Sequence, residues 1–294
     1  MRRSIPPSLS MHLRLLSLLL VLGPLACATG PGLLPPEVPL AAVHREPGML
    51  RVMTFNIQSG ARGLDGVARV IRASVPDLVA LQEVDVGSTR AGGIDQVEAL
   101  SRLTGLPHRA HFRTTDLHGG AYGLAILSRF PLESLAQYSL PVPSGAEPRT
   151  LAHAVVSVDG REVSVYLTHL IRRPFNNATR LRQSAYVARL LAQDSRPRLL
   201  LGDLNDDPDS HSVRLLRRDM RDVVAATGGA RGTYPMPLFL PTLRIDYVLA
   251  CGAFTPVASR VLKVSASDHY PVVADLRLDV LPAADAEGQL TLKR

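Results

Sequence analysis

Short apolar runs recur along the chain at the length that is typical of buried β-strands. Two segments that alternate between apolar and polar residues flank Asp159-Gly160, a dipeptide that predicts a β-hairpin turn. Together these patterns predict strands at residues 50–56, 78–81, 123–127, 153–158, 162–167, 199–201, 244–250 and 270–278.

Helical spacing of apolar residues separates several of these strands. Val67 and Ile71 mark one helix, which we expect Asp65 to cap, and further helices are expected at 95–104 and 177–193. Because helices and hairpins are interleaved, the pattern predicts an α/β fold in one domain, with two packed mixed sheets flanked by helices.

The N-terminal segment has a different pattern. Arginines followed by an almost continuous apolar run from Leu15 to Leu22 predict an export signal over residues 1–27. Leu-Ala before Cys27 resembles a bacterial lipobox, although Pro24 departs from that pattern. We therefore expect a lipid on Cys27 and a membrane-surface location on the cell envelope. The alternative is an ordinary cleaved signal and a periplasmic or secreted protein.

The remaining chain divides into three parts. Residues 28–48 are rich in proline and glycine and are typical of an extended tether. Residues 49–280 carry all the strand and helix patterns and form the expected folded domain, and residues 281–294 form a tail with little pattern. We expect a monomer.

Composition narrows the class of protein. The chain has 294 residues, of which 46% are hydrophobic, enough to bury a substantial core. Its two cysteines, Cys27 and Cys251, exclude a disulfide framework. A formal net charge of +7 is compatible with an anionic substrate, but without a dense basic run it does not identify a nucleic-acid-binding protein.

Six short polar motifs are each placed where an apolar strand-like run ends. They are Thr54-Phe-Asn56, Leu81-Gln-Glu83, Thr168-His169, Gly202-Asp203-Leu-Asn205, Arg244-Ile-Asp246 and Ser267-Asp268-His269. Carboxylates, carboxamides and imidazoles gathered at strand ends suit a site that holds a hard cation and cleaves a phosphate ester. The sequence therefore predicts a metal-dependent phosphoesterase.

Individual motifs suggest individual roles. Glu83 is the expected principal ligand of Mg²⁺, because this cation prefers oxygen ligands and needs one or two protein carboxylates. Asn56 could orient a metal-bound water or a phosphate oxygen. We expect Asp203 and Asn205 on the same side of an extended segment, one contacting metal or activating water and the other donating to the phosphate.

The two histidines suggest acid–base chemistry. Asp268 and His269 are sequence neighbours and should point to opposite faces of a strand, so a second carboxylate must orient His269, and Asp246 is the natural supplier. His169 follows the hairpin strand and could donate to the substrate phosphate and stabilise developing charge.

The ordered series of motifs resembles the endonuclease/exonuclease/phosphatase superfamily, which has the fold of deoxyribonuclease I. The resemblance spans residues 51 to 272 and also includes the Tyr122-Gly-Leu-Ala-Ile-Leu-Ser128 strand. It implies a four-layer α/β sandwich with Mg²⁺ or Mn²⁺ held between the strand ends.

The resemblance also implies a role for each matching position. Asn56 and Glu83 would serve the metal, and Asp268 would contact a second ion. His169 and Asn205 would bind the scissile phosphate, and Tyr122 and Arg149 would contact the substrate. Asp203 would position or deprotonate the attacking water, and Asp246 would orient His269. Whether Asp203 or His269 is the base stays open. Hydrolysis would form no covalent enzyme intermediate.

The substrate class stays open because this fold serves several substrates. Export and a low aromatic content favour a phosphodiesterase or phosphatase acting on a phospholipid or a phosphorylated head group. The first alternative is an exported nuclease acting on DNA or RNA. The second is a binding module that kept the fold and lost turnover.

Overall fold

The structure is a computed structural model that describes residues 45–229, 232–236 and 241–279. The expected export signal, Cys27, most of the tether and the C-terminal tail lie outside the described residues. None of the helices in these ranges is long and apolar enough to span a bilayer.

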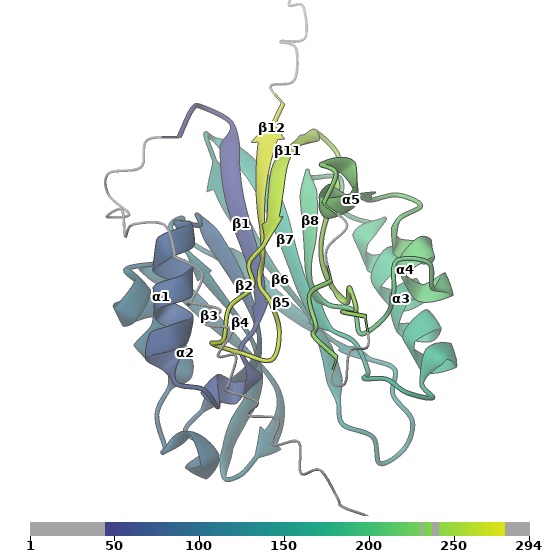
Figure 1. Ribbon diagram of the computed structural model, residues 1–294. Helices are drawn as coiled ribbons and strands as arrows, with labels where there is room; N and C mark the ends of the chain where they lie inside the picture. Colours follow the sequence, from purple (N-terminus) through teal and green to yellow (C-terminus); the bar gives the residue numbers. More distant parts are fainter. Residues whose placement is uncertain (1–44, 230–231, 237–240, 280–294) are drawn as a thin grey trace, which may run out of the picture. The chain divides into compact units, whose positions relative to one another are not determined.

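The described residues contain two sheets of six strands each (Figure 1). The first has the order β11-β12-β1-β2-β4-β3, with β1 Met49–Asn56, β2 Leu78–Val86, β3 His108–Leu117, β4 Gly120–Ser128, β11 Phe254–Val261 and β12 Val272–Leu278. The second has the order β5-β6-β7-β8-β10-β9, with β5 Glu133–Leu140, β6 Arg149–Val158, β7 Arg161–His169, β8 Arg198–Asp203, β9 Arg221–Asp222 and β10 Asp246–Cys251.

Each sheet contains one parallel pair among antiparallel neighbours. In the first sheet β1 runs parallel to β2, and in the second β7 runs parallel to β8. The prediction of two mixed sheets is therefore confirmed. The parallel pairs matter for the site, because the carboxyl ends of two parallel strands reach the same edge of a sheet.

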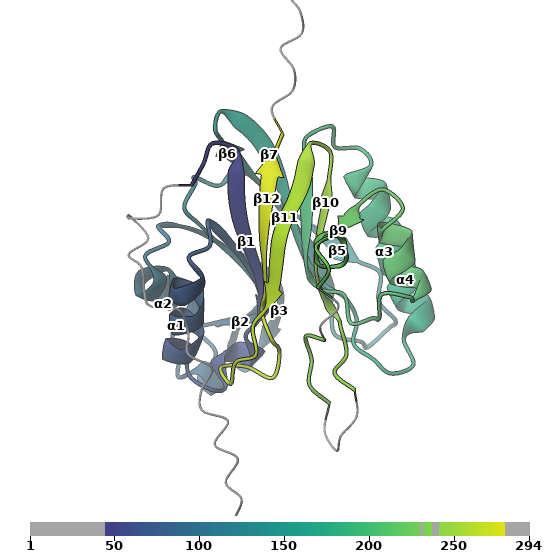
Figure 2. The same cartoon turned by 45° about the horizontal axis from the view of Figure 1, so that its top comes forward.

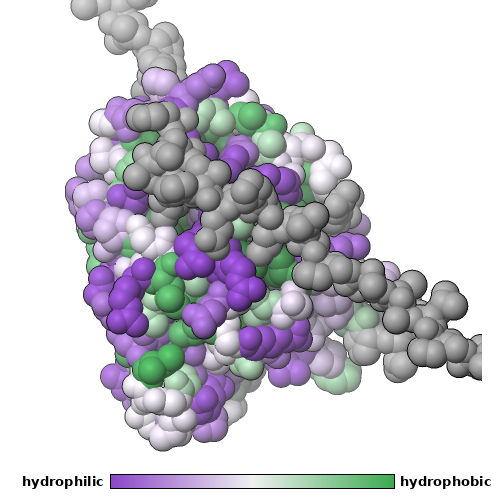
Figure 3. Space-filling model, turned by 60° about the vertical axis from the view of Figure 1, so that its left-hand side comes forward, coloured by the Kyte–Doolittle hydropathy of each residue, from purple (hydrophilic) through white to green (hydrophobic). Residues whose placement is uncertain are grey.

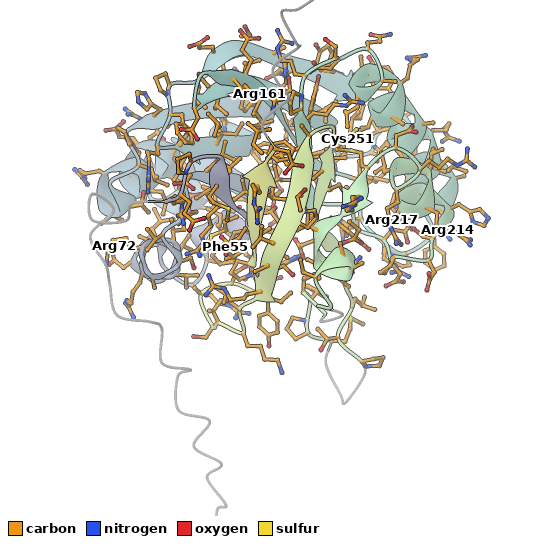
Figure 4. The ribbon with its side chains drawn as sticks, turned by 90° about the horizontal axis from the view of Figure 1, so that it is seen from above. Phe55, Arg72, Arg161, Arg214, Arg217 and Cys251 are labelled. Carbon is orange, nitrogen blue, oxygen red and sulfur yellow. The ribbon has the colours of Figure 1, made fainter. Side chains whose placement is uncertain are left out.

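Helices cover the outer face of each sheet (Figures 1 and 2). The first sheet carries α1 Leu64–Ser74 and α2 Gln96–Thr104, and the second carries α3 Asn177–Leu191 and α4 His211–Leu216; α5 Val223–Ala226 and two 3-10 turns, η2 Gln58–Gly60 and η3 Thr89–Ala91, complete the elements. Seen from above, Arg72 of α1 and Arg214 of α4 lie at opposite outer sides, with the sheets between them (Figure 4). The arrangement is the expected four-layer α/β sandwich.

Alternation along each strand divides the apolar residues among three clusters. In β1, Val52 belongs to the cluster between the two sheets, whereas Met53 and Phe55 pack against α1 and α2. A third cluster lies between the second sheet and the helices α3 and α4. Strands buried on both faces read as continuous apolar runs, which explains why they were recognisable in the sequence.

The structure differs from the sequence prediction at the sheet edges and at one helix start. The long strands β3, β5 and β11 were not predicted, and each lies at the edge of its sheet, where polar residues replace an apolar run. Asp95 caps α2 by accepting from the backbone amides of Val97 and Glu98. Asp65 does not cap α1, since Gly63 is the N-cap residue and Asp65 lies in the first turn.

Candidate active site

Strand ends from both sheets meet at one edge of the sandwich. Asn56 ends β1, His169 ends β7 and Asp203 ends β8, where His169 and Asp203 are register partners. Asp246 begins β10, directly opposite Asp203. The expectation that every motif follows a strand is therefore wrong for Asp246, which begins β10, and for His269, which precedes β12. These residues still reach the same edge, because an antiparallel strand starts where its neighbour ends.

Strand alternation turns these side chains into the space between the sheets. Leu201 belongs to the inter-sheet cluster, and Asp203 is the next residue of β8 on the same face. Asn56, His169 and Asp246 occupy the corresponding positions on β1, β7 and β10. The polar site is thus a continuation of the inter-sheet core at its edge.

Glu83 reaches the site through a β-bulge. The register of β2 against β4 shifts between Gln82 and Val84, and Glu83 adopts a φ of 57°. By simple alternation Glu83 would share the face of Leu81, which packs under the helices. The bulge redirects its side chain. Sequence reasoning placed Glu83 at the end of a strand, but β2 continues to Val86.

Asn56 links the two sheets by hydrogen bonds. Its Nδ2 donates to Glu83 Oε1 at 2.9 Å and lies 3.4 Å from Asp203 Oδ2. Its Oδ1 accepts from the backbone amide of Gln58 at 3.0 Å, and its backbone oxygen accepts from Ser267 Oγ at 2.7 Å. The buried carboxamide of Asn56 therefore contacts a residue of each sheet, and its backbone carbonyl holds the loop that carries His269.

Asp203 lies at the centre of the group. Its Oδ2 is 3.4 Å from His169 Nε2 and 3.8 Å from His269 Nε2. Its Oδ1 accepts from the backbone amide of Asn205 at 2.8 Å, and Asn205 Nδ2 donates to the Leu170 carbonyl at 3.1 Å. The segment is a turn, with Asn205 at a φ of 52°, so the expectation of an extended segment is wrong.

Asp246 is the partner of His269, at 2.9 Å between Oδ2 and Nδ1. Thr233 Oγ1 accepts from the backbone amide of Asp246 at 3.1 Å, and the Tyr234 ring packs against the His269 ring with centroids 4.8 Å apart. Sequence reasoning missed Thr233 and Tyr234. They lie on a loop outside any periodic segment, and a Gly-Thr-Tyr sequence there carries no distinctive signal.

Burial and neighbouring carboxylates perturb the titration of this group. Burial raises the pKa of Asp203 to about 7, and the charge of nearby Asp246 acts in the same direction. The charge of His269 opposes this rise. Burial opposes the charged form of His269, but Asp246 and Asp203 overcome it and raise its pKa to about 10. Burial lowers the pKa of His169 well below its usual value, and the Arg149 charge acts in the same direction. In the neutral range His269 is therefore charged and His169 is neutral.

A narrow pocket extends from the site toward β3, β4 and β6. It is lined by Thr114, Tyr122, Arg149, Thr150 and His169, among others. The Arg149 side chain is 4% exposed and pairs with Glu147 through Nη1, while its Nε is buried and has no hydrogen-bond partner within the described ranges. An unpartnered guanidinium N–H beside a catalytic-type histidine suits an anionic ligand.

The oxygen donors near Glu83 fit a divalent cation. Burial raises the pKa of Glu83, the hydrogen bond from Asn56 opposes this, and Asp268 is close enough to raise it further. A buried carboxylate near a second carboxylate is stabilised in its charged form by a hard cation. Asp203, Asp246 and His269 also have ligand atoms within 4.8 Å of one another, but His269 Nδ1 already contacts Asp246.

All the expected site residues within the described ranges lie in one region, whereas Cys27 lies outside them. Asn56, Glu83, His169, Asp203, Asn205, Asp246 and His269 are joined by the contacts above; Asp268 neighbours Glu83, and Tyr122 and Arg149 line the adjoining pocket.

Comparison with known proteins gives three informative similarities. The chain is similar to an endonuclease/exonuclease/phosphatase from Beutenbergia cavernae, with 31% identity, a TM-score of 0.66, and coverage of 80% of this chain and 73% of that one. It shares its fold with a mannosyl-6-phosphatase from Bacteroides thetaiotaomicron, at 16% identity, a TM-score of 0.64, and coverage of 77% and 99%. It is 28% identical over 143 residues to protein cwh43 of Schizosaccharomyces pombe, covering 49% of this chain but only 14% of that protein.

A family model described as "Endonuclease/Exonuclease/phosphatase family" matches residues 53–269, a span that includes every site residue from Asn56 to His269. The match covers well over half of the chain and agrees with the fold and with the ordered motifs. The chain therefore belongs to the endonuclease/exonuclease/phosphatase family, whose members are generally hydrolases of phosphate esters.

Proposed function

We propose that this protein is a divalent-metal-dependent hydrolase that attacks a phosphate ester with water and forms no covalent enzyme intermediate. The observation that carries the proposal is the position of Asp203, whose Oδ2 faces Asn56 Nδ2, His169 Nε2 and His269 Nε2 at 3.4, 3.4 and 3.8 Å. Three polar side chains from both sheets surround one carboxylate oxygen, so a substrate bound there would meet all four groups at once.

Asp203 is the proposed base. Its Oδ2 faces the site, whereas the Nδ1 of His269 is bonded to Asp246 and the Nε2 of His269 faces Asp203 itself. Asp203 would therefore take the proton of the attacking water. His269, held charged by Asp246, would stabilise the negative charge that develops on the phosphate.

Two further side chains would hold the phosphate. Arg149 offers its buried Nε, which has no hydrogen-bond partner among the described residues, and His169 lines the same pocket. Asn205 is fixed by its bond to the Leu170 carbonyl and would contribute a third polar contact. Donors fixed before the substrate arrives stabilise the transition state without further reorganisation.

Glu83 would hold Mg²⁺ or Mn²⁺, with Asp268 available to a second ion. Asn56 would serve the metal by positioning Glu83, because the Nδ2 that faces this carboxylate is a donor and its Oδ1 accepts from the Gln58 amide. When bound, the metal would polarise a phosphate oxygen and lower the pKa of a coordinated water. The hydrogen bond between Asn56 Nδ2 and Glu83 Oε1 at 2.9 Å leaves Glu83 Oε2 available for that contact.

A phospholipid or a phosphorylated head group is the proposed substrate class. Phosphatase activity on a sugar phosphate is the named activity of one protein with the same fold. The expected export signal and the Cys27 lipid would place the enzyme beside a membrane, and this part rests on residues 1–27 of the sequence. Recovery of the full chain only from soluble fractions of cells would contradict the anchor.

The test is hydrolysis by the purified protein with Mg²⁺, with Mn²⁺ and with EDTA, on plasmid DNA, sphingomyelin and inositol phosphates in parallel. We expect metal-dependent turnover of the lipid or the head group. Metal-dependent nicking of DNA alone would replace the proposed substrate by a nucleic acid. The absence of turnover on all substrates, generic esters included, would favour a binding module.

The site assignment is tested by Glu83→Ala and His269→Ala. We expect each to lower kcat by about a thousandfold or more, because one removes the metal ligand and the other the charge beside Asp203. Matched controls are Glu162→Ala, in an exposed ion pair with Arg196, and His211→Ala on the exposed start of α4. Wild-type turnover by either folded site variant would refute the assignment.

A further inference from the structure

A second cavity, of about 350 Å³, lies beside the proposed catalytic centre on the α1 side. It is formed by the loop that follows Asn56 and by the loop that follows β2, together with the first turn of α1. Its lining includes Ser59, Leu64, Asp65, Arg90, Ile94 and Gln96. The strands β1 and β2, which contain Asn56 and Glu83, are thus followed by the loops that form the walls of this cavity.

Arg90 is the fixed cation of the cavity. Its Nε and Nη2 donate to the two oxygens of Asp85 at 2.7 and 2.9 Å, and Nη2 also donates to Ser59 Oγ at 2.7 Å. Asp85 is fully buried. The Arg90 Nη1 amino group makes no hydrogen bond to any residue that the structure describes. Asp85 and Ser59 therefore fix the guanidinium, while the two N–H groups of Nη1 remain available to a ligand.

Tyr122 connects the cavity to the narrow pocket of the candidate active site. The Arg90 guanidinium lies over the Tyr122 ring at 5.2 Å from its centroid, and Tyr122 lines the pocket that contains Arg149 and His169. Tyr122 therefore lies between Arg90 of the cavity and the pocket that contains Arg149.

The walls of the cavity are preformed. Gln96, which is buried, donates through Nε2 to the Ser59 carbonyl at 2.7 Å and accepts through Oε1 from the Asp85 amide at 2.9 Å. Arg62 Nη1 donates to the Ser267 carbonyl at 2.7 Å and so ties the first loop to the segment of His269. Gln58 and Ser59 both adopt left-handed backbone conformations, at φ of 51°, which residues with side chains seldom do without such support.

We propose that this cavity is the subsite for the alcohol portion of the ester and that it selects a hydroxyl-rich ring, a sugar or a cyclitol. The inference rests on the proposed function and adds the class of alcohol to it. Arg90 Nη1 would donate to ring oxygens, Asp65 would accept from ring hydroxyls, and Ile94, which is 46% exposed, would cover an apolar face of the ring.

Other alcohols match the lining less well. An acyl chain would remove water from the Asp65 carboxylate and from Arg90 Nη1 without forming a hydrogen bond to either group. Because unpaired polar groups are costly to desolvate, such a ligand would bind weakly. A nucleobase would find no aromatic residue to stack on in the lining. The side of the molecule that carries α1, where it is formed by described residues, mixes hydrophilic and hydrophobic side chains (Figure 3).

The test compares two phosphodiesters, glycerophosphoinositol, which has a cyclitol ring, and bis(p-nitrophenyl) phosphate, which has none. The first variant is Arg90→Lys, which keeps the positive charge and loses the planar guanidinium. The second is Ala61→Trp, which fills the cavity from an exposed position on its wall and leaves the ion pair of Asp85 with Arg90 intact. We expect each to lower kcat/KM at least tenfold for glycerophosphoinositol and less than twofold for the nitrophenyl ester. The matched control Arg109→Lys, in an exposed ion pair with Glu98, should change neither.

Calorimetry of glycerophosphoinositol binding in EDTA separates this inference from the proposed function. Weaker binding by Ala61→Trp than by wild type supports the subsite even if no ester is hydrolysed, an outcome that would refute only the proposed activity. Equal loss for both esters, or no change in either rate or binding in the folded Ala61→Trp protein, would refute the subsite.

Discussion

Two carboxylates from distant parts of the chain, Asp246 and Asp203, stabilise the charged imidazole of His269 more than its sequence neighbour Asp268 does. Asp246 lies 2.9 Å from Nδ1 and Asp203 lies 3.8 Å from Nε2, and the two come from different strands. Burial alone would favour the neutral ring, so the ion pairs decide its state. The role proposed for His269, stabilising negative charge, depends on them.

Replacing Asp246 by Asn tests this dependence. A carboxamide cannot stabilise the imidazolium as a carboxylate does, so we expect the pKa of His269 to fall toward its ordinary value and kcat to fall at least about a hundredfold. NMR titration of the His269 ring and kcat measured against pH are the two readouts. Asp116→Asn, at an exposed ion pair with Arg113, is the control. An unchanged His269 titration would contradict the pairing as the cause.

At the scale of elements, the parallel pair β7–β8 positions His169 and Asp203 as register partners. The two strands approach so closely at Gly202 that a Cβ there would lie 1.9 Å from the Thr168 carbonyl oxygen. Gly202 also has a φ of 145°, which side chains disfavour. The glycine before Asp203 is thus required by the backbone geometry of the pair.

Gly202→Ala should therefore damage both stability and activity. We expect the free energy of unfolding to fall by at least about 3 kcal/mol, because the strands must separate to relieve a backbone clash. Chemical denaturation measures this loss. Gly145→Ala is the control: φ is 74° there but nothing lies within 4 Å, so a loss of about 1 kcal/mol is expected. Equal losses at the two glycines would show that the close approach is absent.

At the scale of the whole molecule, stability depends on buried groups far from the catalytic edge. On the outer face of the second sheet, the His153 ring stacks on Tyr166 with centroids 4.4 Å apart, and its Nε2 lies 3.2 Å from Ser164 Oγ. Burial lowers the pKa of His153, more than the nearby charge of Asp194 raises it. The folded protein therefore holds this ring neutral in a range where the unfolded chain protonates it.

This difference gives the sign of a pH effect on folding. Below a pH of about 6.5 the unfolded state binds a proton that folded His153 does not, so stability is complete above that pH and falls as the pH decreases. We expect His153→Gln to reduce the loss of unfolding free energy between pH 7.5 and 5.5 by up to about 1 kcal/mol. His211→Gln, on an exposed site, should leave the loss unchanged. An identical pH dependence in wild type and His153→Gln would contradict the assignment.

Several parts of this structure could be predicted from the sequence because their signals are local. The inner strands are apolar runs, α2 and α3 have helical periodicity, and Asp159-Gly160 forms the turn between β6 and β7. Edge strands such as β5 escaped prediction because solvent faces them and no apolar run is needed. The Glu83 bulge escaped prediction because alternation alone assigns Glu83 to the wrong face.

The family, the layered α/β fold and the residue types of the site could be inferred from the chain alone, since ordered motifs and hydrophobic periodicity are properties of the sequence. Which groups contact one another depends on how the strands pair and the sheets pack. The pairing of β7 with β8 places Asp203 beside His169, and the pairing of β8 with β10 places it opposite Asp246, the partner of His269. These residues are separated by long stretches of chain. Packing also brought Thr233 and Tyr234 to the site and Arg90 over the Tyr122 ring, because loop positions follow from packing and hydrogen bonding rather than from a periodic pattern.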